Sequence, residues 1–191
     1  AAAPHASDNP MMVMVDEETG NKYMRAVPHK GLGEDGDNSW LVKDMHQELK
    51  SWGHPGGAGN ALILKSDGEP AIVAVREALA RCHGGVVTPE QPPVGEHQSN
   101  GTAEEAGRTV RDHARVLKLQ LQAKVGREID ADEPIMSWLI RWAAMCVSRY
   151  QVGKDSNPRT KDKRVARATA GSSHLERLSF TACRQWRGTG I

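Results

Sequence analysis

The chain has 191 residues, a length that allows one domain of ordinary size with a real hydrophobic core. Only 38% of the residues are hydrophobic and 4% aromatic, so we expect a modest, mainly aliphatic core. The net charge of +1 is unevenly spread: residues 151–191 carry 9 Lys and Arg against 3 Asp and Glu, whereas residues 1–150 carry 16 against 21. A basic tail on a mildly acidic body favours a nucleic-acid partner or, equally, a solvated terminus.

The cysteines and the apolar runs bear on the redox compartment of the protein and on whether it crosses a membrane. The three cysteines lie far apart and form no Cys-x-x-Cys pair, which argues against a zinc site or a disulfide framework. This usage suits a reducing compartment. No signal peptide is recognisable, and the most apolar run, PIMSWLIRWAAMCV (134–147), is too short to span a bilayer. We therefore expect no membrane partner.

The hydrophobic pattern predicts alternating strands and helices, which is typical of an α/β layered domain. In chain order, we expect a β-hairpin over 11–27, a helix that follows the loop 31–39 and ends at Trp52, a strand over 60–67, a helix over 69–82, a brief strand within 85–95, and helices over 102–125 and 134–150. The last helix is apolar almost all round, so it should be buried. We assign residues 1–151 to this domain and expect 152–191 to form an irregular, poorly ordered basic tail.

Acidic residues stand at two element boundaries. Asp67 follows a predicted strand, where open α/β sheets usually place their ligands, and Glu104 and Glu105 open the helix over 102–125. Each has an ordinary structural explanation, because Asp caps helices and acidic first turns complement the helix dipole. Two acids from separate elements can also converge on Mg²⁺, and paired metal ions promote phosphodiester chemistry.

The helix pattern separates the two glutamates. Glu104 begins a face that continues, at steps of four and three residues, with Arg108, Arg111, Arg115 and Lys118. An apolar face lies one residue step round the helix and consists of Ala103, Val110, Ala114, Leu117 and Leu121. The apolar face should pack inward, so the basic face should point outward. It is suited to DNA phosphates, although charged helix faces are usually only solvated.

Two segments resemble a known family. LKSDGEP (64–70) and HQSNGTAEEAGRTVRDHARVL (97–117) resemble the catalytic core of retrotransposon and retroviral integrases, which are DDE polynucleotidyl transferases with a ribonuclease-H-like fold. Residues 98–104 match the family's Q-x-N-G-x-x-E turn. There are 36 residues between Asp67 and Glu104, close to the spacing in the family's D-D-35-E motif. The resemblance covers about residues 11–158.

The resemblance implies both a fold and a function. The fold is a ribonuclease-H-like mixed sheet flanked by helices, and the function is DNA integration by metal-dependent strand transfer. Asp67 and Glu104 are implied as catalytic ligands of Mg²⁺ or Mn²⁺, and Glu105 has no assigned chemistry. Arg108, Arg111, Arg115 and Lys118 are expected to hold DNA phosphates with little base readout. Element ends and target DNA are the implied partners, with a homo-oligomer and a nuclear location.

The chain departs from the family pattern at its start. The family carries its first acid on a central strand upstream of the hairpin, but only AAAPHASDNP precedes the hairpin here. Asp8 lies in a turn-like segment, and Asp16 lies at the hairpin turn, away from the expected site. We therefore expect the first strand to be missing. Residues 11–15 and 61–65 would then have to pair with each other, with another chain or with water.

Because the first acid would be missing together with that strand, we expect no strand transfer from the chain. Two alternatives remain open. The first is a non-catalytic nucleic-acid-binding module with the same shape and basic surface. The second is an unrelated small α/β protein whose acids are helix caps.

Overall fold

The computed structural model describes residues 10–33, 39–57, 60–91, 101–152 and 176–183. Each element predicted between residues 11 and 150 is present, with small shifts at its ends. The elements in chain order are β1 (Met11–Asp16), β2 (Lys22–Ala26), α1 (Ser39–Trp52), β3 (Ala61–Ser66), α2 (Pro70–His83), β4 (Val86–Glu90), α3 (Gly101–Val125), α4 (Pro134–Tyr150) and β5 (Glu176–Cys183).

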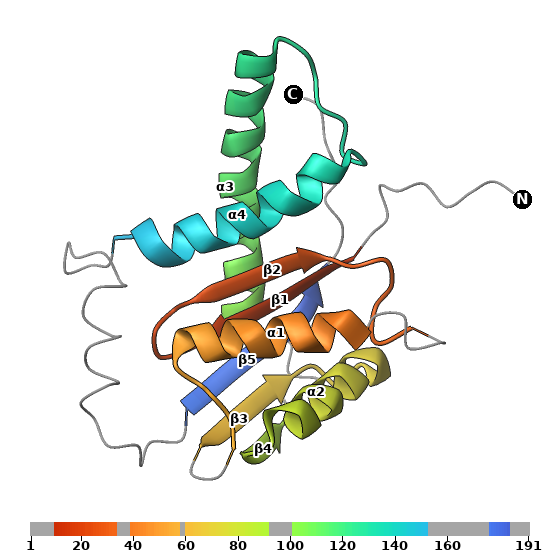
Figure 1. The fold of residues 1–191 in the computed structure, drawn as a ribbon, viewed down its shortest axis with the longest axis vertical. Coiled ribbons are helices and arrows are strands. Elements are labelled where there is room, and N and C mark those ends of the chain that lie inside the picture. The colour runs from red at the N-terminus through yellow and green to blue at the C-terminus, as the bar shows by residue number, and fades with distance from the viewer. Residues whose placement is uncertain (1–9, 34–38, 58–59, 92–100, 153–175, 184–191) are drawn as a thin grey trace, which may run out of the picture.

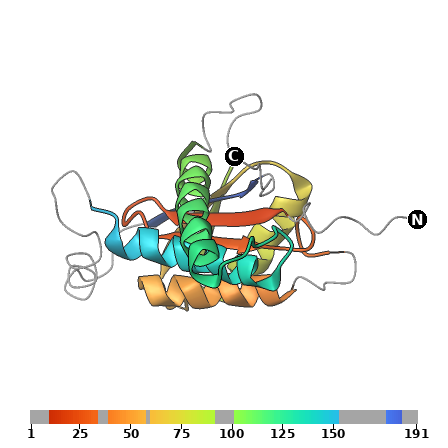
Figure 2. The ribbon, with the colours of Figure 1, turned by 90° about the horizontal axis from the view of Figure 1, so that it is seen from above.

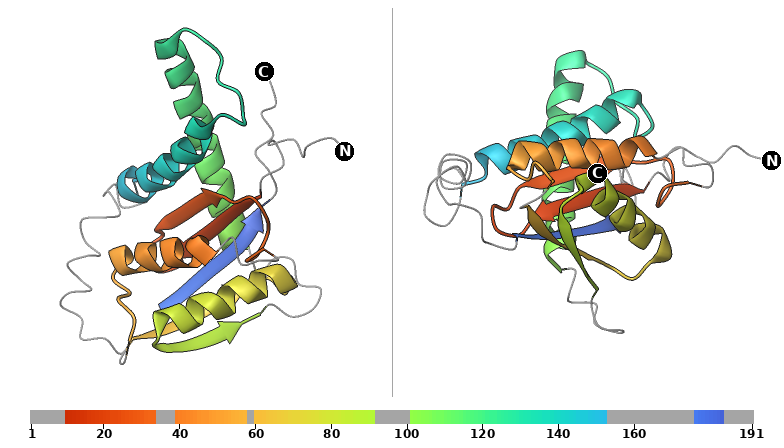
Figure 3. Two further views of the ribbon diagram at one scale, coloured as in Figure 1. Left: turned by 45° about the vertical axis from the view of Figure 1, so that its right-hand side comes forward. Right: turned by 60° about the horizontal axis from the view of Figure 1, so that its bottom comes forward.

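The strands form one mixed sheet in the order β2-β1-β5-β3-β4. Strand β1 is antiparallel to both β2 and β5, whereas β3 is parallel to both β5 and β4. Figure 3 shows β5, in blue, between β1 and β3. The fold class is therefore α/β with a mixed five-stranded sheet, a layout compatible with a ribonuclease-H-like domain.

Helices cover both faces of the sheet, so the domain has three layers (Figures 1 and 2). The side chains of β1 alternate between two core clusters, because successive residues of a strand point to opposite faces. Met12 and Met14 pack with α1 and α2, whereas Met11, Val13 and Val15 pack with α3 and α4. All six residues of β1 are buried, as expected for a strand covered on both sides.

Local sequence explains where two of the elements turn or end. The β1–β2 hairpin turns through Gly20, whose φ of 70° lies in the left-handed region that glycine tolerates best. Helix α2 begins at Pro70, which suits a first helical position because it lacks a backbone N–H. It ends at Gly84, whose φ is 67° and whose N–H bonds the carbonyl oxygen of Ala80 at 3.3 Å.

The largest difference from expectation is strand β5. We expected no regular element after residue 151, yet 176–183 form the central strand of the sheet. Leu178 and Phe180 are fully buried on the face covered by α1 and α2, and Ser179 and Thr181 are buried on the other. The expected gap between 11–15 and 61–65 is therefore filled by this chain's own C-terminal part. The expectation that these strands pair with each other, with another chain or with water is wrong.

Helix α4 also differs from expectation, because only one side of it is buried. It packs on β2 and α3, at the edge of the sheet, and no other described element covers its outer side. Trp138 and Trp142 are 54% and 42% exposed there, and Tyr150 is exposed as well. Within the described part of the chain, no helix has the length and apolar character needed to cross a membrane.

Candidate functional site

Asp67 lies at the end of β3, beside the end of β5. Ser66 pairs with Phe180, so the next residues on the two parallel strands are Asp67 and Thr181. The Thr181 hydroxyl donates a hydrogen bond of 2.8 Å to Oδ2 of Asp67. The other oxygen, Oδ1, is buried and has no hydrogen-bond partner among the residues that the structure describes.

Asp67 does not cap α2, the structural role that its position in the sequence allowed. The N-cap residue of α2 is Glu69, which makes no side-chain capping bond. One Asp67 oxygen is instead directed to Thr181 on a neighbouring strand, and the other is unpartnered. The helix-cap alternative is therefore wrong for this residue.

Several charges act on the Asp67 carboxyl group. Its pKa is raised, first because burial disfavours the ionised form. The negative charges of Glu69 and Glu104 raise this pKa further, whereas the Thr181 hydrogen bond and the charge of Lys30 lower it. Glu104, in the first turn of α3, is exposed and near enough for its charge to act on Asp67. The site thus draws Asp67, Thr181 and Glu104 from β3, β5 and α3.

The chemistry of these three side chains fits one divalent cation better than two. An unpartnered carboxylate oxygen on Asp67 and the exposed carboxylate of Glu104 are ligands of the type that Mg²⁺ and Mn²⁺ prefer. Such ions are often held by one or two carboxylates and complete their shell with water. Among the described residues, no three His, Cys, Asp or Glu side chains form a group that could hold a metal. That Asp67 and Glu104 share an ion stays a prediction.

Asp16, one of the two residues considered for the first acid, does not join this group. Asp16 is fully buried at the β1–β2 turn, where its Oδ1 accepts hydrogen bonds from the backbone N–H groups of Glu18 and Thr19. It pairs with Leu178, at the opposite end of β5 from Thr181, so it stabilises the hairpin far from Asp67. Asp8 lies outside the described residues.

Helix α3 presents the two faces expected from its sequence. Ala103, Val110 and Ala114 are buried, and Leu117 and Leu121 pack against the same core cluster. The basic face of this helix, which we call the α3 stripe, consists of Arg108, Arg111, Arg115 and Lys118. Arg108 and Arg115 are exposed, whereas Arg111 and Lys118 are half-buried. Arg115 also pairs with Asp112 at 2.5 Å between Nη1 and Oδ1. The outward orientation of the stripe is confirmed, and its contact with DNA stays a prediction.

A polar cluster between α1 and α2 went unnoticed in the sequence. Cys82 Sγ lies 3.2 Å from Nδ1 of His46, and the rings of His46 and His83 meet edge to face at 5.9 Å. Burial lowers the pKa of both imidazoles, which favours their neutral forms. The residues come from two helices that only the fold brings together, so their spacing along the chain carried no signal.

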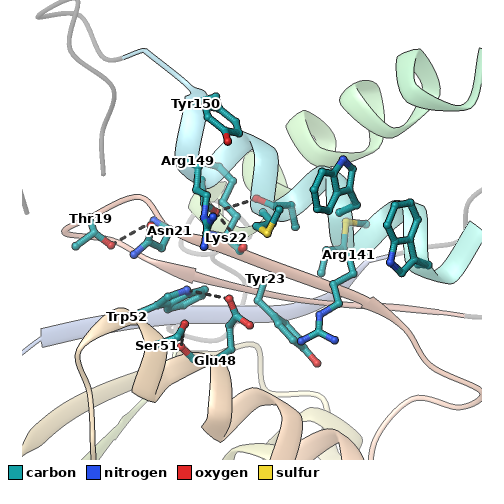
Figure 4. Close-up of a pocket in the computed structure, with 16 residues that line it drawn as sticks. Thr19, Asn21, Lys22, Tyr23, Glu48, Ser51, Trp52, Arg141, Arg149 and Tyr150 are labelled. Carbon is teal, nitrogen blue, oxygen red and sulfur yellow. Dashed lines mark hydrogen bonds between the residues drawn. The ribbon is translucent and has the colours of Figure 1, made fainter. Parts of the chain in front are cut away.

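A groove lies between α1 and α4, beside β2, and was also missed (Figure 4). Its volume is about 690 Å³, within the range of pockets that hold small ligands. Three tryptophans line it: Trp52 from α1, and Trp138 and Trp142 from α4. In the sequence, the available signal was a pair of tryptophans four residues apart, Trp138 and Trp142. The apolar character of their helix indicated complete burial instead.

No protein-family model matches this chain, and no curated protein is significantly similar to it. The family resemblance therefore depends on the residues of segments 64–70 and 97–117 themselves.

Proposed function

We propose that this chain is an integrase-type domain that binds the DNA backbone and keeps two of the three acids of a polynucleotidyl transferase site. The arrangement of the sheet supports the proposal. A ribonuclease-H-like sheet pairs its second strand with its first, and its first with the strand that ends in the second acid. Strand β5 takes the place of that first strand, since it lies between β1 and β3, antiparallel to one and parallel to the other.

The hydrogen bond from Thr181 to Asp67 is the observation that carries the proposal. In the family, the first acid projects from the strand whose place β5 takes here. Thr181 is the β5 residue whose side chain reaches Asp67, so a neutral hydroxyl stands where a carboxylate would be needed. Two carboxylates are a poor site for two ions, and we therefore expect DNA binding without detectable strand transfer.

The roles of the residues follow from their positions. A bound Mg²⁺ or Mn²⁺ would supply charge stabilisation to a phosphodiester under attack. Asp67 and Glu104 would hold the ion, and Thr181 fixes the orientation of the Asp67 carboxylate. The α3 stripe extends from Glu104 along the same helix, which would place DNA phosphates beside the acids.

The test is to supply the missing carboxylate. We expect Thr181→Asp to bind Mn²⁺ at least about tenfold more tightly than the unchanged chain, because a third carboxylate adds charge and a ligand. Isothermal titration calorimetry measures this affinity, and a joining assay with a short duplex that carries a free 3′-hydroxyl measures strand transfer. Thr181→Asn is the matched neutral control, and adding Glu104→Gln to Thr181→Asp should remove the gain.

Two results would contradict the proposal. One is a folded Thr181→Asp variant whose Mn²⁺ affinity is unchanged, since Asp67 and residue 181 would then not belong to one site. The other is strong joining by the unchanged chain that Glu104→Gln abolishes, which would mean that two acids suffice or that a third lies elsewhere. Circular dichroism of each variant establishes that it is folded.

The binding-only alternative is favoured by the exposure of Arg108 and Arg115, which does not depend on any metal site. It predicts salt-sensitive DNA binding with no gain of metal affinity in Thr181→Asp. The Mn²⁺ titration of Thr181→Asp thus separates the two functions.

A further inference from the structure

We propose that the groove between α1 and α4 binds single-stranded nucleic acid, with bases stacked on Trp138 and Trp142 and phosphates held by Arg141 and Arg149. This binding surface is distinct from the α3 stripe and from the acidic site. It does not depend on the chemistry of Asp67.

The aromatic surface is the first observation. The rings of Trp138 and Trp142 are almost parallel, with an interplanar angle of 11° and centroids 5.5 Å apart. They are four residues apart on α4, so the helix holds them side by side. Both are about half exposed, although burial of large aromatic side chains usually stabilises a protein. An exposed, prearranged pair of aromatic rings is a suitable platform for nucleobases.

The charges of the groove give the second observation. Of the described residues that line it, Lys22, Arg141 and Arg149 are basic, whereas Glu48 is the acidic one. The Glu48 carboxylate is already engaged, because it accepts a hydrogen bond of 3.2 Å from the indole nitrogen of Trp52. An anionic occupant is therefore favoured by charge complementarity.

The arrangement of these side chains favours a single strand over a duplex. Arg141 lies between the two tryptophans in sequence and extends from α4 toward Tyr23, while Arg149 lies two turns further along the helix (Figure 4). Basic side chains thus alternate with aromatic rings along one side of the groove. Base faces are available for stacking only in an unpaired strand, because a duplex stacks them on each other.

The position of the groove separates it from the acidic site. The groove lies beside β2, at one edge of the sheet, whereas Asp67 follows β3, with β1 and β5 between these two strands. A strand in the groove would therefore make contacts that a duplex on the α3 stripe does not need.

The experiment uses the whole chain and a fluorescently labelled oligothymidine of about 20 nucleotides, titrated by anisotropy. We expect Trp138→Ala/Trp142→Ala to weaken binding about tenfold or more, because stacking is lost from two positions. Trp138→Phe/Trp142→Phe should restore most of the affinity. Trp40→Ala is the matched control: Trp40 is 39% exposed on α1, outside the groove lining, and its removal should leave the affinity unchanged.

Two further measurements test whether the variants are folded and whether a second copy of the chain occupies the groove. Thermal unfolding should be similar for all variants, since the substituted tryptophans are exposed. Equal oligothymidine binding by the unchanged chain and by Trp138→Ala/Trp142→Ala would overturn the proposal. So would a dimer in sedimentation velocity that this double substitution dissociates while strand affinity stays the same, since the tryptophans would then contact a second copy.

Discussion

Asp67 combines two negative neighbours with a buried carboxylate oxygen that has no hydrogen-bond partner among the described residues, and this combination opposes ionisation in the folded state. Its pKa is therefore higher in the folded chain than in the unfolded chain. For such a group the stabilising contribution is complete below the unfolded pKa and is lost as the pH rises through the folded pKa. At neutral pH the ionised Asp67 thus lowers the free energy of unfolding.

Replacing this carboxyl group should consequently stabilise the protein. We expect Asp67→Asn to raise the midpoint of thermal unfolding at pH 7, with a gain that shrinks as the pH approaches about 3, below the ordinary range for Asp. The amide oxygen can still accept the Thr181 hydrogen bond, so the substitution should remove little stabilising energy. Differential scanning calorimetry at both pH values measures the effect. A lower midpoint at pH 7 would show that the ionised group is stabilised by a contact other than these.

The sequence predicted the positions of Asp67 and Glu104 but not the surroundings of Asp67. Thr181 is 114 residues away along the chain and meets Asp67 only through the register of two parallel strands. A threonine in an alternating segment carries no sign of such a contact. Trp138 and Trp142 were visible as apolar residues of a helix, and their exposure depends on how much of α4 the sheet and α3 cover.

At the scale of elements, regular periodicity decided what could be predicted. Helix α3 has 25 residues, and its apolar and basic faces are each repeated over several turns, so both its existence and its orientation followed from sequence. Strand β5 has eight residues and lies in a polar, basic context. Its alternation of Leu178 and Phe180 with Ser179 and Thr181 spans only four residues, too few to distinguish a buried strand from a solvated segment.

The α3 stripe leads to a prediction for the helix as an element. We expect Arg108→Ala/Arg115→Ala to weaken duplex DNA binding for all sequences about equally. The slope of log affinity against log salt should fall by about 2, because each lost phosphate contact releases about one counterion fewer. Lys124→Ala, which removes an exposed charge from the same helix away from the stripe, is the control. An unchanged slope in the double variant would assign the stripe to a solvated face.

The whole molecule depends on β5 because this strand joins the two parts of the sheet. On one side are β1 and β2, on the other β3 and β4, and β5 is hydrogen-bonded to both β1 and β3. Phe180 is fully buried in the core cluster that includes α1 and α2. The two parts should consequently unfold together, in one cooperative transition.

Truncating that side chain tests the dependence. We expect Phe180→Ala to lower the free energy of unfolding by about 3–5 kcal/mol, a large fraction of the stability of an ordinary domain. Urea denaturation followed by tryptophan fluorescence and by circular dichroism measures the loss and shows whether both probes change together. Arg177→Ala, a substitution on the same strand as Phe180, is the control, because it removes only a partly exposed ion pair with Glu90 of β4. A loss below about 1 kcal/mol would mean that β5 contributes little to the core.

The central position of β5 also sets the order in which the protein can be completed during synthesis. The ribosome releases β1 and β3 long before residues 176–183, so the inner edges of both strands stay unpaired while more than a hundred further residues are added after β3. Unpaired edges with buried-type residues such as those of β1 are prone to join other chains. Nascent chains of this protein should therefore depend on chaperones until β5 emerges, and slow translation of the segment that contains β5 should lower the yield of folded protein.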